Sequence, residues 1–281
     1  MSLKDILVHI GDTKATAVRL KTALAIAKQH KAKITGVYVV PFPTALGSMG
    51  GMDESLDPSV FETMLDHGRE RATVAKKAFK ALTTGSGVTC AWVQAEGYLV
   101  DVLSRHGRYA DLIVLGQNDS EAPFDLDRRG MPDQIILEVA RPVLVVPREG
   151  NFTKVGKNPA VAWNGSAVAT RAIHDAMPIL EKAKKAMVLT VEDKDAPKGN
   201  GNGSDGELAK HLGRHGVKAK VERVKSEDPT DGASLLRAVS RRKADMIVMG
   251  AYGQWRLKEL VLGGVTNHVL GNANVPVLMS H

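Results

Sequence analysis

The chain has 281 residues, of which 43% are hydrophobic, 25% charged and 4% aromatic, with a formal net charge of +7. This composition excludes a disordered chain and favours globular domains, with two domains the better expectation at this length. The single cysteine, Cys90, excludes an internal disulfide and a cysteine-based zinc cluster, so a reducing compartment is expected.

The apolar runs are too short for a membrane span, and the first residues do not have the layout of a signal peptide. We therefore expect a cytoplasmic protein with no membrane partner. The basic residues are scattered along predicted helices, for example at Lys182, Lys184 and Lys185, and no recognition-helix motif accompanies them. Despite the positive charge, nucleic acid is not an expected partner.

Short apolar runs alternate with helical periodicity along the whole chain. This alternation is typical of parallel sheets that are covered by helices on both faces. In chain order the predicted strands are 5–10, 33–40, 88–94, 111–116, 142–146, 160–163, 186–192, 217–224, 245–250 and 276–279.

The second half of the chain repeats the pattern of the first. KITGVYVV at 33–40 matches KAMVLTVE at 185–192, and ADLIVLG at 110–116 matches ADMIVMG at 244–250. We predict two tandem doubly wound domains with five strands each, at 1–148 and 157–281, joined by a polar linker. The first half also has a Pro/Gly/Met-rich insertion at 41–59, followed by an amphipathic helix near 60–82.

A glycine ladder, G-x2-G-x9-G, begins directly after a buried strand at Gly250, Gly253 and Gly263. Glycines in a turn between a strand and a helix let backbone N–H groups point at a phosphate. In doubly wound sheets the ligand binds at the carboxyl ends of the strands where the strand order reverses, here between Asn164 and Gly250. In the alternative interpretation, the glycines only make a tight turn and allow close helix packing.

The ladder, together with VAWNGS at 161–166 and a hydroxyl residue at Thr266, resembles the universal stress protein family. The duplication makes the whole chain look like a tandem member. The resemblance implies a Rossmann-like sheet of the adenine-nucleotide alpha-hydrolase type in each domain. It also implies binding of ATP or another adenine nucleotide, with Mg conceivable, in the second domain. The nucleotide-binding residues that it implies are Asn164, Val191, Gly250, Ala251, Gly253, Gly263, Gly264, Val265 and Thr266.

The chain departs from the family pattern at two of these positions. Gly264 stands where the family has a serine or threonine, and Asn164 stands where nucleotide-binding members commonly have an aspartate. The first half departs further, because Asp119, Arg129 and Pro132 replace Gly253, Gly263 and Thr266. Negative charge near phosphates is unfavourable, so we expect the first half to have lost triphosphate binding. Its Asp12 remains at the end of the first strand.

Three functions stay open. The first is a stress-response module that binds ATP through its second domain and signals to an unidentified protein partner. The second is a nucleotide-independent interaction module that uses its sheet edges and the insertion at 41–59, and the third is a weak ATPase. No catalytic residue is expected, because there is no P-loop and no Ser–His arrangement. The pair His211 and His215 lacks a third ligand in the sequence, so no metal is expected.

The assembly is predicted from the last strand of each half. The runs 142–146 and 276–279 are short, apolar and equivalent, so the two halves are expected to pair edge to edge within the chain. A homodimer of two chains also stays possible.

Overall fold

The computed structural model describes residues 2–42, 58–117, 131–192, 204–226, 230–253 and 264–281. Most of the predicted insertion at 41–59 lies outside these ranges. So do the ladder residue Gly263 and the substituted positions Asp119 and Arg129.

Strands are present at all ten places where the sequence predicts them. Their bounds are β1 (Asp5–Ile10), β2 (Lys33–Pro41), β3 (Cys90–Gly97), β4 (Leu112–Gly116), β5 (Val143–Val146), β6 (Pro159–Ala162), β7 (Ala186–Glu192), β8 (Ala219–Lys225), β9 (Met246–Gly250) and β10 (Val277–Ser280). The helices between them are α1 (Ala15–His30), α2 (Pro58–Thr83), α3 (Leu99–Gly107), α4 (Met131–Glu138), α5 (Ala167–Leu180), α6 (Ser204–Arg214), α7 (Asp231–Arg241) and α8 (Gly264–Asn272).

Two of the strands, β3 and β8, begin two residues later than predicted, because the turn before each one runs further. Before β3, Gly85 and Gly87 adopt positive φ, and the backbone N–H of Val88 donates to the Ser86 hydroxyl. Before β8, the backbone N–H of Val217 donates to the carbonyl of Leu212, which closes the C-terminal end of α6. The spacing of apolar residues does not predict such hydrogen bonds in turns.

The strands form one sheet in the order β3-β2-β1-β4-β5-β10-β9-β6-β7-β8. Within each half all neighbouring strands are parallel. The predicted fold class, a doubly wound Rossmann-like α/β fold, is confirmed. The two five-stranded sheets are joined, because β5 and β10 pair antiparallel, with Leu144 opposite Leu278. The division into domains at 1–148 and 157–281 stays a prediction.

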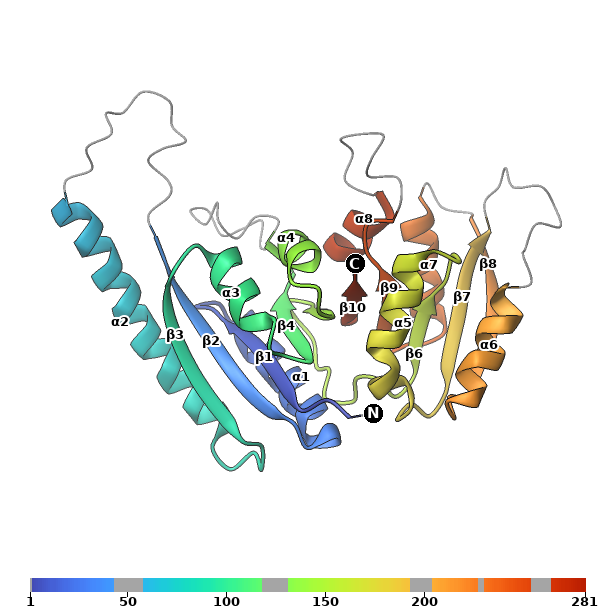
Figure 1. Cartoon of the computed structure of the whole chain (residues 1–281), viewed down its shortest axis with the longest axis horizontal. Coiled ribbons are helices and arrows are strands. Elements are labelled where there is room, and N and C mark those ends of the chain that lie inside the picture. Colours follow the sequence, from blue (N-terminus) through green and yellow to red (C-terminus); the bar gives the residue numbers. More distant parts are fainter. Residues whose placement is uncertain (1, 43–57, 118–130, 193–203, 227–229, 254–263) are drawn as a thin grey trace, which may run out of the picture.

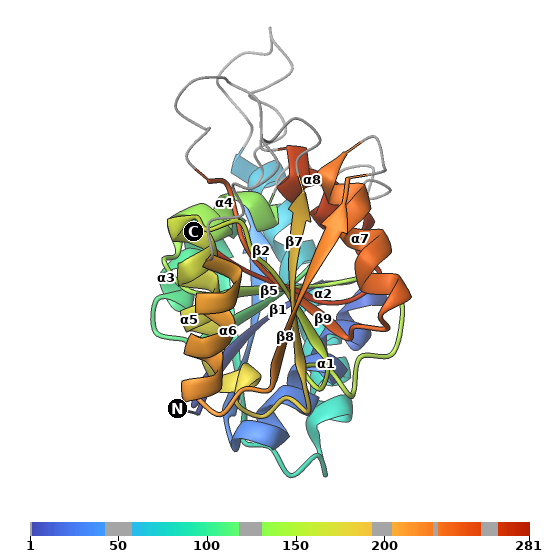
Figure 2. The same cartoon turned by 90° about the vertical axis from the view of Figure 1, so that its right-hand side faces the viewer.

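Both faces of the sheet are buried, as expected for parallel strands under crossover helices. Ile6 and Val8 of β1 belong to one core cluster, whereas Leu7 between them belongs to a second cluster. The first cluster contains side chains of α1, α2, α5 and α6, and the second contains side chains of α3, α4, α7 and α8. Helices therefore lie on both sides of the strongly twisted sheet (Figure 2).

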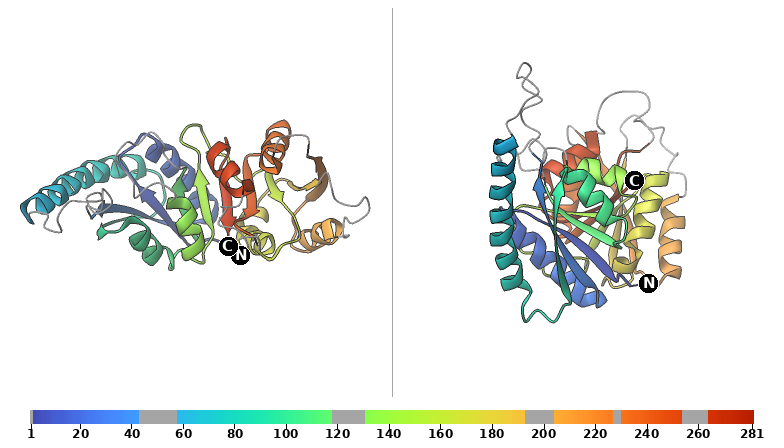
Figure 3. Two further views of the ribbon diagram at one scale, coloured as in Figure 1. Left: turned by 90° about the horizontal axis from the view of Figure 1, so that it is seen from above. Right: turned by 60° about the vertical axis from the view of Figure 1, so that its left-hand side comes forward.

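The molecule is elongated, with the first half at one end and the second half at the other (Figure 1). The long helix α2 lies at the outer end of the first half. Both chain termini lie near the junction of the halves (Figure 3). Within the described ranges, no helix has the length and hydropathy that crossing a membrane requires.

Candidate functional site

A cavity of about 410 Å³ lies in the second half, at the point where the strand order reverses. Strands β6 and β9 are neighbours there, and the chain leaves them toward α5 and α8. The cavity is within the range of small-molecule sites, which is roughly 300–1,000 Å³. The reversal therefore creates a ligand-sized hollow at the place that the sheet topology predicts.

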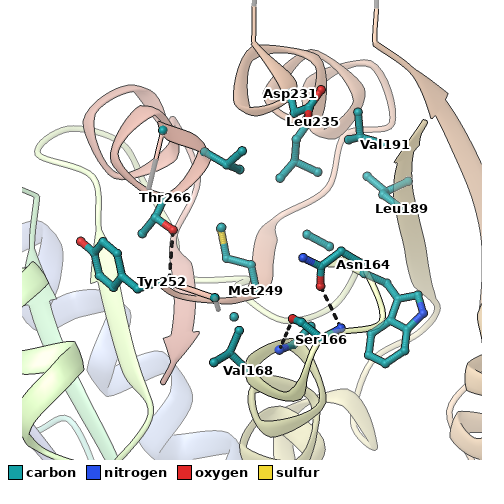
Figure 4. A pocket seen from close by; sticks show the side chains of 17 residues that line it. Asn164, Ser166, Val168, Leu189, Val191, Asp231, Leu235, Met249, Tyr252 and Thr266 are labelled. Atoms are coloured by element: carbon teal, nitrogen blue, oxygen red, sulfur yellow. Dashed lines mark hydrogen bonds between the residues drawn. The ribbon is translucent and has the colours of Figure 1, made fainter. Parts of the chain in front are cut away.

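Asn164 and Ser166 build the wall that follows β6. The Ser166 hydroxyl accepts a hydrogen bond from the backbone N–H of Ala169 at 3.2 Å and so caps α5. The backbone N–H of Ser166 donates to Oδ1 of Asn164 at 3.1 Å. Because that N–H can only donate, the amide oxygen must face it, and the Asn164 NH₂ group is turned toward the cavity (Figure 4). Asn164 thus offers a donor to a ligand.

The three described glycines of the cavity wall differ in what they pack against. A Cβ on Gly250 would lie 2.5 Å from the carbonyl carbon of Val168 and 2.6 Å from the nitrogen of Ala169, so the close approach of α5 requires this glycine. A Cβ on Gly253 would meet only a Val168 methyl at 3.8 Å, and one on Gly264 would meet nothing within 4 Å. Packing against the described residues explains Gly250, but it does not explain Gly253 or Gly264.

The segment after β9 is held at several points. The backbone N–H of Ala251 donates to the Ser280 carbonyl at 2.9 Å, and the Ala251 carbonyl lies 3.0 Å from Nδ1 of His281. The backbone N–H of Tyr252 faces the Thr266 hydroxyl at 3.4 Å. Two of these bonds join the segment to the end of the chain and one joins it to α8, so the wall residues keep a fixed relative position.

One side of the cavity is apolar. Its wall includes Leu189 and Val191 of β7, Leu235 of α7 and Met249 of β9 (Figure 4). Strand β6 ends beside β7, where the N–H of Trp163 donates to the Leu189 carbonyl. The N–H and carbonyl of successive residues point to alternate sides of a strand, so after Leu189 the next residue of β7 whose backbone groups face β6 is Val191. Strand β6 ends opposite Leu189, so Val191 lies beyond its last residue. This geometry leaves one backbone donor and one acceptor beside an apolar surface.

Three helices begin at the cavity. Residues from the first turns of α5, α7 and α8 line it, including Val168, Asp231 and Val265. The first N–H groups of a helix lack intrahelical partners and carry a partial positive charge, which favours anions. Among the described lining residues, Asp231 is the one side chain with a full charge, and it accepts a hydrogen bond from the Ser226 hydroxyl at 2.9 Å. An anion would therefore be held by backbone groups rather than by lysine or arginine in this part of the wall.

Most of the predicted site residues lie together on this cavity wall, namely Asn164, Val191, Gly250, Gly253, Gly264, Val265 and Thr266. Ala251 lies behind the wall, fully buried, and Gly263 falls outside the described residues. The structure adds residues that the sequence reasoning did not assign to the site, above all Asp231 and Leu235. Their place at the start of a helix after a parallel strand is a usable signal, since such starts lie at the carboxyl edge of the sheet.

The equivalent place in the first half has a different lining. The Tyr38 hydroxyl donates to Asp12 at 2.8 Å, and Arg71 lies 3.9 Å from the same carboxylate. The Arg19 guanidinium is buried against Gly116, where a Cβ would lie 2.3 Å from Nη1. Side chains of the first half therefore contact Asp12 and Gly116, which correspond to Asn164 and Gly250 of the second half. Pro132, which replaces Thr266, is buried in α4 and brings no hydroxyl.

Three histidines lie close together on α5 and α6, and none of them lines the cavity. The His211 ring lies 5.8 Å from the ring of His174 and 4.7 Å from that of His215. Burial and the neighbouring rings lower the pKa of His211. In the part of the chain that the structure describes, no three His, Cys, Asp or Glu side chains are placed to hold a metal ion.

Comparison with known proteins starts from this second half. Residues 160–281 match the family model described as the universal stress protein family. The second half of the chain, which holds the cavity, thus matches that family. The universal stress protein Slr1230 of Synechocystis sp. is 27% identical over 186 residues, which are 65% of this chain and 62% of that protein. The match thus spans less than two thirds of the relative's length.

The likeness in fold extends to the first half. A universal stress protein from Archaeoglobus fulgidus covers 98% of this chain, and 95% of that chain is covered, with a TM-score of 0.77 at 18% identity. At this identity the likeness concerns the fold. A universal stress protein solved in complex with cAMP covers 53% of this chain and 100% of its own, with a TM-score of 0.39 at 17% identity.

Proposed function

We propose that the cavity of the second half binds an adenine nucleotide, with ATP as the first candidate. The observation that carries the proposal is that one cavity combines two different parts. One part is apolar and lies beside the backbone N–H and carbonyl of Val191, and the other is formed by helix starts and by Gly253 and Gly264, which packing against the described residues does not explain. A planar base with polar edges fits the first part, and phosphates fit the second.

The apolar part matches a base. A ring that slides between Leu189, Val191 and Met249 buries apolar area, and the backbone N–H and carbonyl of Val191 supply one donor and one acceptor for the ring edge. The family resemblance implies the same role for Val191. A purely apolar ligand would leave these backbone groups without partners, which costs free energy.

The polar part matches phosphates without requiring a P-loop. Gly253 and Gly264 leave room for a ligand atom to approach the backbone, and Asn164 presents its NH₂ group. The position of Asp231 beside α7 suits an acceptor for sugar hydroxyls and disfavours a phosphate on that side. Mg could accompany ATP, and the described wall offers Asp231 as its one carboxylate.

The wider role belongs to the same proposal. We propose that the two units, 1–148 and 157–281, act as a cytoplasmic stress-response protein and that occupancy of the second unit signals to a protein partner or a second copy. The support is the match of residues 160–281 to the universal stress protein family, together with the lone Cys90. The nucleotide-independent interaction module and the weak ATPase stay as predictions from the sequence, because no described contact favours either of them.

Isothermal titration calorimetry of the purified chain with ATP, with and without Mg, tests the proposal. We expect saturable binding in the wild type and binding at least tenfold weaker in Gly253→Asp, because a carboxylate at this position repels phosphate and its Cβ blocks the backbone. Gly213→Asp is the matched control. Gly213 is exposed near the end of α6 with nothing within 4 Å of a built Cβ, and its substitution should leave the affinity unchanged.

The contradicting outcomes are plain. No heat of binding at millimolar ATP would remove nucleotide binding from this protein. If Gly253→Asp and Gly213→Asp lower the affinity for ATP equally, the bound ATP does not lie in the cavity.

A further inference from the structure

Tyr252 links the cavity of the second half to the first half of the chain. Its backbone lines the cavity, whereas its ring points away from it toward the first half (Figure 4). There the phenol hydroxyl donates a hydrogen bond to the carboxylate of Asp133, in the first turn of α4. The tyrosine is 4% exposed and Asp133 is half-buried, so the contact is partly buried.

The backbone of Tyr252 is in an unusual conformation. Its φ is +50°, in the left-handed region that residues other than glycine rarely adopt. Such a conformation costs free energy and persists only where the surroundings fix it. Here the surroundings are the Thr266 hydroxyl on the backbone N–H and Asp133 on the side chain. The conformation at residue 252 sets the direction in which the chain enters Gly253.

Asp133 is well placed to hold the tyrosine. A carboxylate in the first turn of a helix is stabilised by the partial positive charge of the helix start. Helix α4 is itself fixed, because Met131, Ile135 and Ile136 are buried in the core beneath it. The acceptor for the tyrosine hydroxyl is therefore part of a rigid element of the first half.

We propose that Asp133 and Tyr252 are positioning residues. Through them the first half holds residues 250–253 of the second half in the conformation that binds the nucleotide. The inference rests on the proposed nucleotide site and extends it. The first half, whose own equivalent place is lined by Asp12, Tyr38 and Arg19, serves as the platform for the other site. This role gives a physical reason for carrying both halves in one chain.

The proposal has a thermodynamic consequence. If only part of the molecules hold residues 250–253 in the binding conformation, the apparent affinity falls by that fraction. Loss of the Tyr252 hydroxyl leaves the cavity wall unchanged and removes one support of the left-handed backbone. By reciprocity, ATP that binds this conformation must also strengthen the contact between the halves.

Calorimetric titration with ATP of the full chain and three variants tests the inference. The variants are Tyr252→Phe, Asp133→Ala and the double substitution, with Tyr109→Phe as the matched control, since Tyr109 is 85% exposed. We expect each single variant to bind ATP about fivefold to tenfold more weakly and the double variant no more weakly than the singles. Thermal unfolding of each variant, measured without ATP, separates loss of folding from loss of positioning.

Each outcome decides something. Wild-type chain that binds no ATP contradicts the proposed function, and the positioning role falls with it. Wild-type binding with an unchanged affinity in Tyr252→Phe overturns the positioning role alone and leaves the nucleotide site standing. A double variant whose loss equals the product of the single losses shows that the two residues act independently, which also overturns it. A lower unfolding temperature with unchanged affinity assigns the pair a purely structural role.

Discussion

Gly250 and Gly264 sit on one cavity wall, yet they are glycine for different physical reasons. The backbone of α5 leaves no room for a side chain at Gly250, whereas a Cβ at Gly264 has open space around it. The sequence offered two interpretations of the ladder, close packing or a phosphate cradle. The structure assigns packing to Gly250, and under the proposed function the approach of a ligand is the reason for Gly253 and Gly264.

Substitution of the two glycines separates these reasons. Gly250→Ala forces its methyl group against the backbone of Val168 and Ala169, and we expect the free energy of unfolding to fall by about 1–3 kcal/mol. Gly264→Ala, at the start of α8, should change it by less than about 1 kcal/mol in either direction. Urea denaturation followed by circular dichroism measures both. Equal stability of the two variants would contradict the packing explanation for Gly250.

The role of Asn164 can be predicted from the sequence only in part. Its amide can donate or accept, and the sequence leaves both roles open. The choice depends on the Ser166 backbone N–H, which takes the oxygen and leaves the NH₂ group for the cavity. That contact is local in sequence, but it requires the backbone turn that positions α5, and residue types alone do not specify the turn.

At the scale of elements, hydrophobic periodicity and the internal repeat sufficed to predict ten strands, their order along the chain and the place of the cavity. The strand ends were less predictable, because the turn bonds at Val88 and Val217 delay β3 and β8. Asp231 and Leu235 were not assigned to the wall because the prediction followed the ladder and the end of β6, and it did not use the helix start after β8. The sheet brings such helix starts together at one edge, so the start of α7 could have been added to the predicted site.

The halves also differ in one element. Helix α2 spans Pro58–Thr83, whereas its counterpart α6 spans Ser204–Arg214. The shorter helix faces β7 and β8, and the longer helix extends along β2 at the outer end of the first half (Figure 1). The repeat therefore conserves the sheet more closely than the helices that cover it.

At the scale of the molecule, the junction of the halves rests on strand pairing and on polar contacts at the end of α1. β5 pairs with β10, and the Lys157 ammonium donates to the side chain of Gln29 at 2.9 Å. Lys182 also donates to the Gln29 carbonyl. His30, next in sequence, is 3% exposed and its Nδ1 accepts from the Leu3 backbone N–H. Two lysines of the second half thus surround a buried histidine of the first.

This arrangement predicts acid sensitivity. Burial, followed by the charges of Lys182 and Lys157, lowers the pKa of His30 to about 4 from an ordinary value of 6.5. Between these values the unfolded chain binds a proton that the folded chain does not, so stability falls as the pH falls from about 6.5 to about 4, by up to about 3 kcal/mol. Urea denaturation at a series of pH values should show this loss in the wild type and a smaller loss in His30→Gln.

The matched control for that series is His67→Gln, because His67 is exposed on α2. Its pH profile should follow the wild type. A profile of His30→Gln that coincides with the wild type would show that the acid sensitivity arises elsewhere.

The central claim is that one of the two related halves holds one adenine nucleotide. Native mass spectrometry of the full chain with ATP measures this most directly, since it counts the ligands bound to each chain. We predict one ATP per chain in the wild type and none in Gly253→Asp at the same concentration. Two ATP molecules per chain, or one that persists unchanged in Gly253→Asp, would contradict the account, and so would a wild-type chain without bound nucleotide at millimolar ATP.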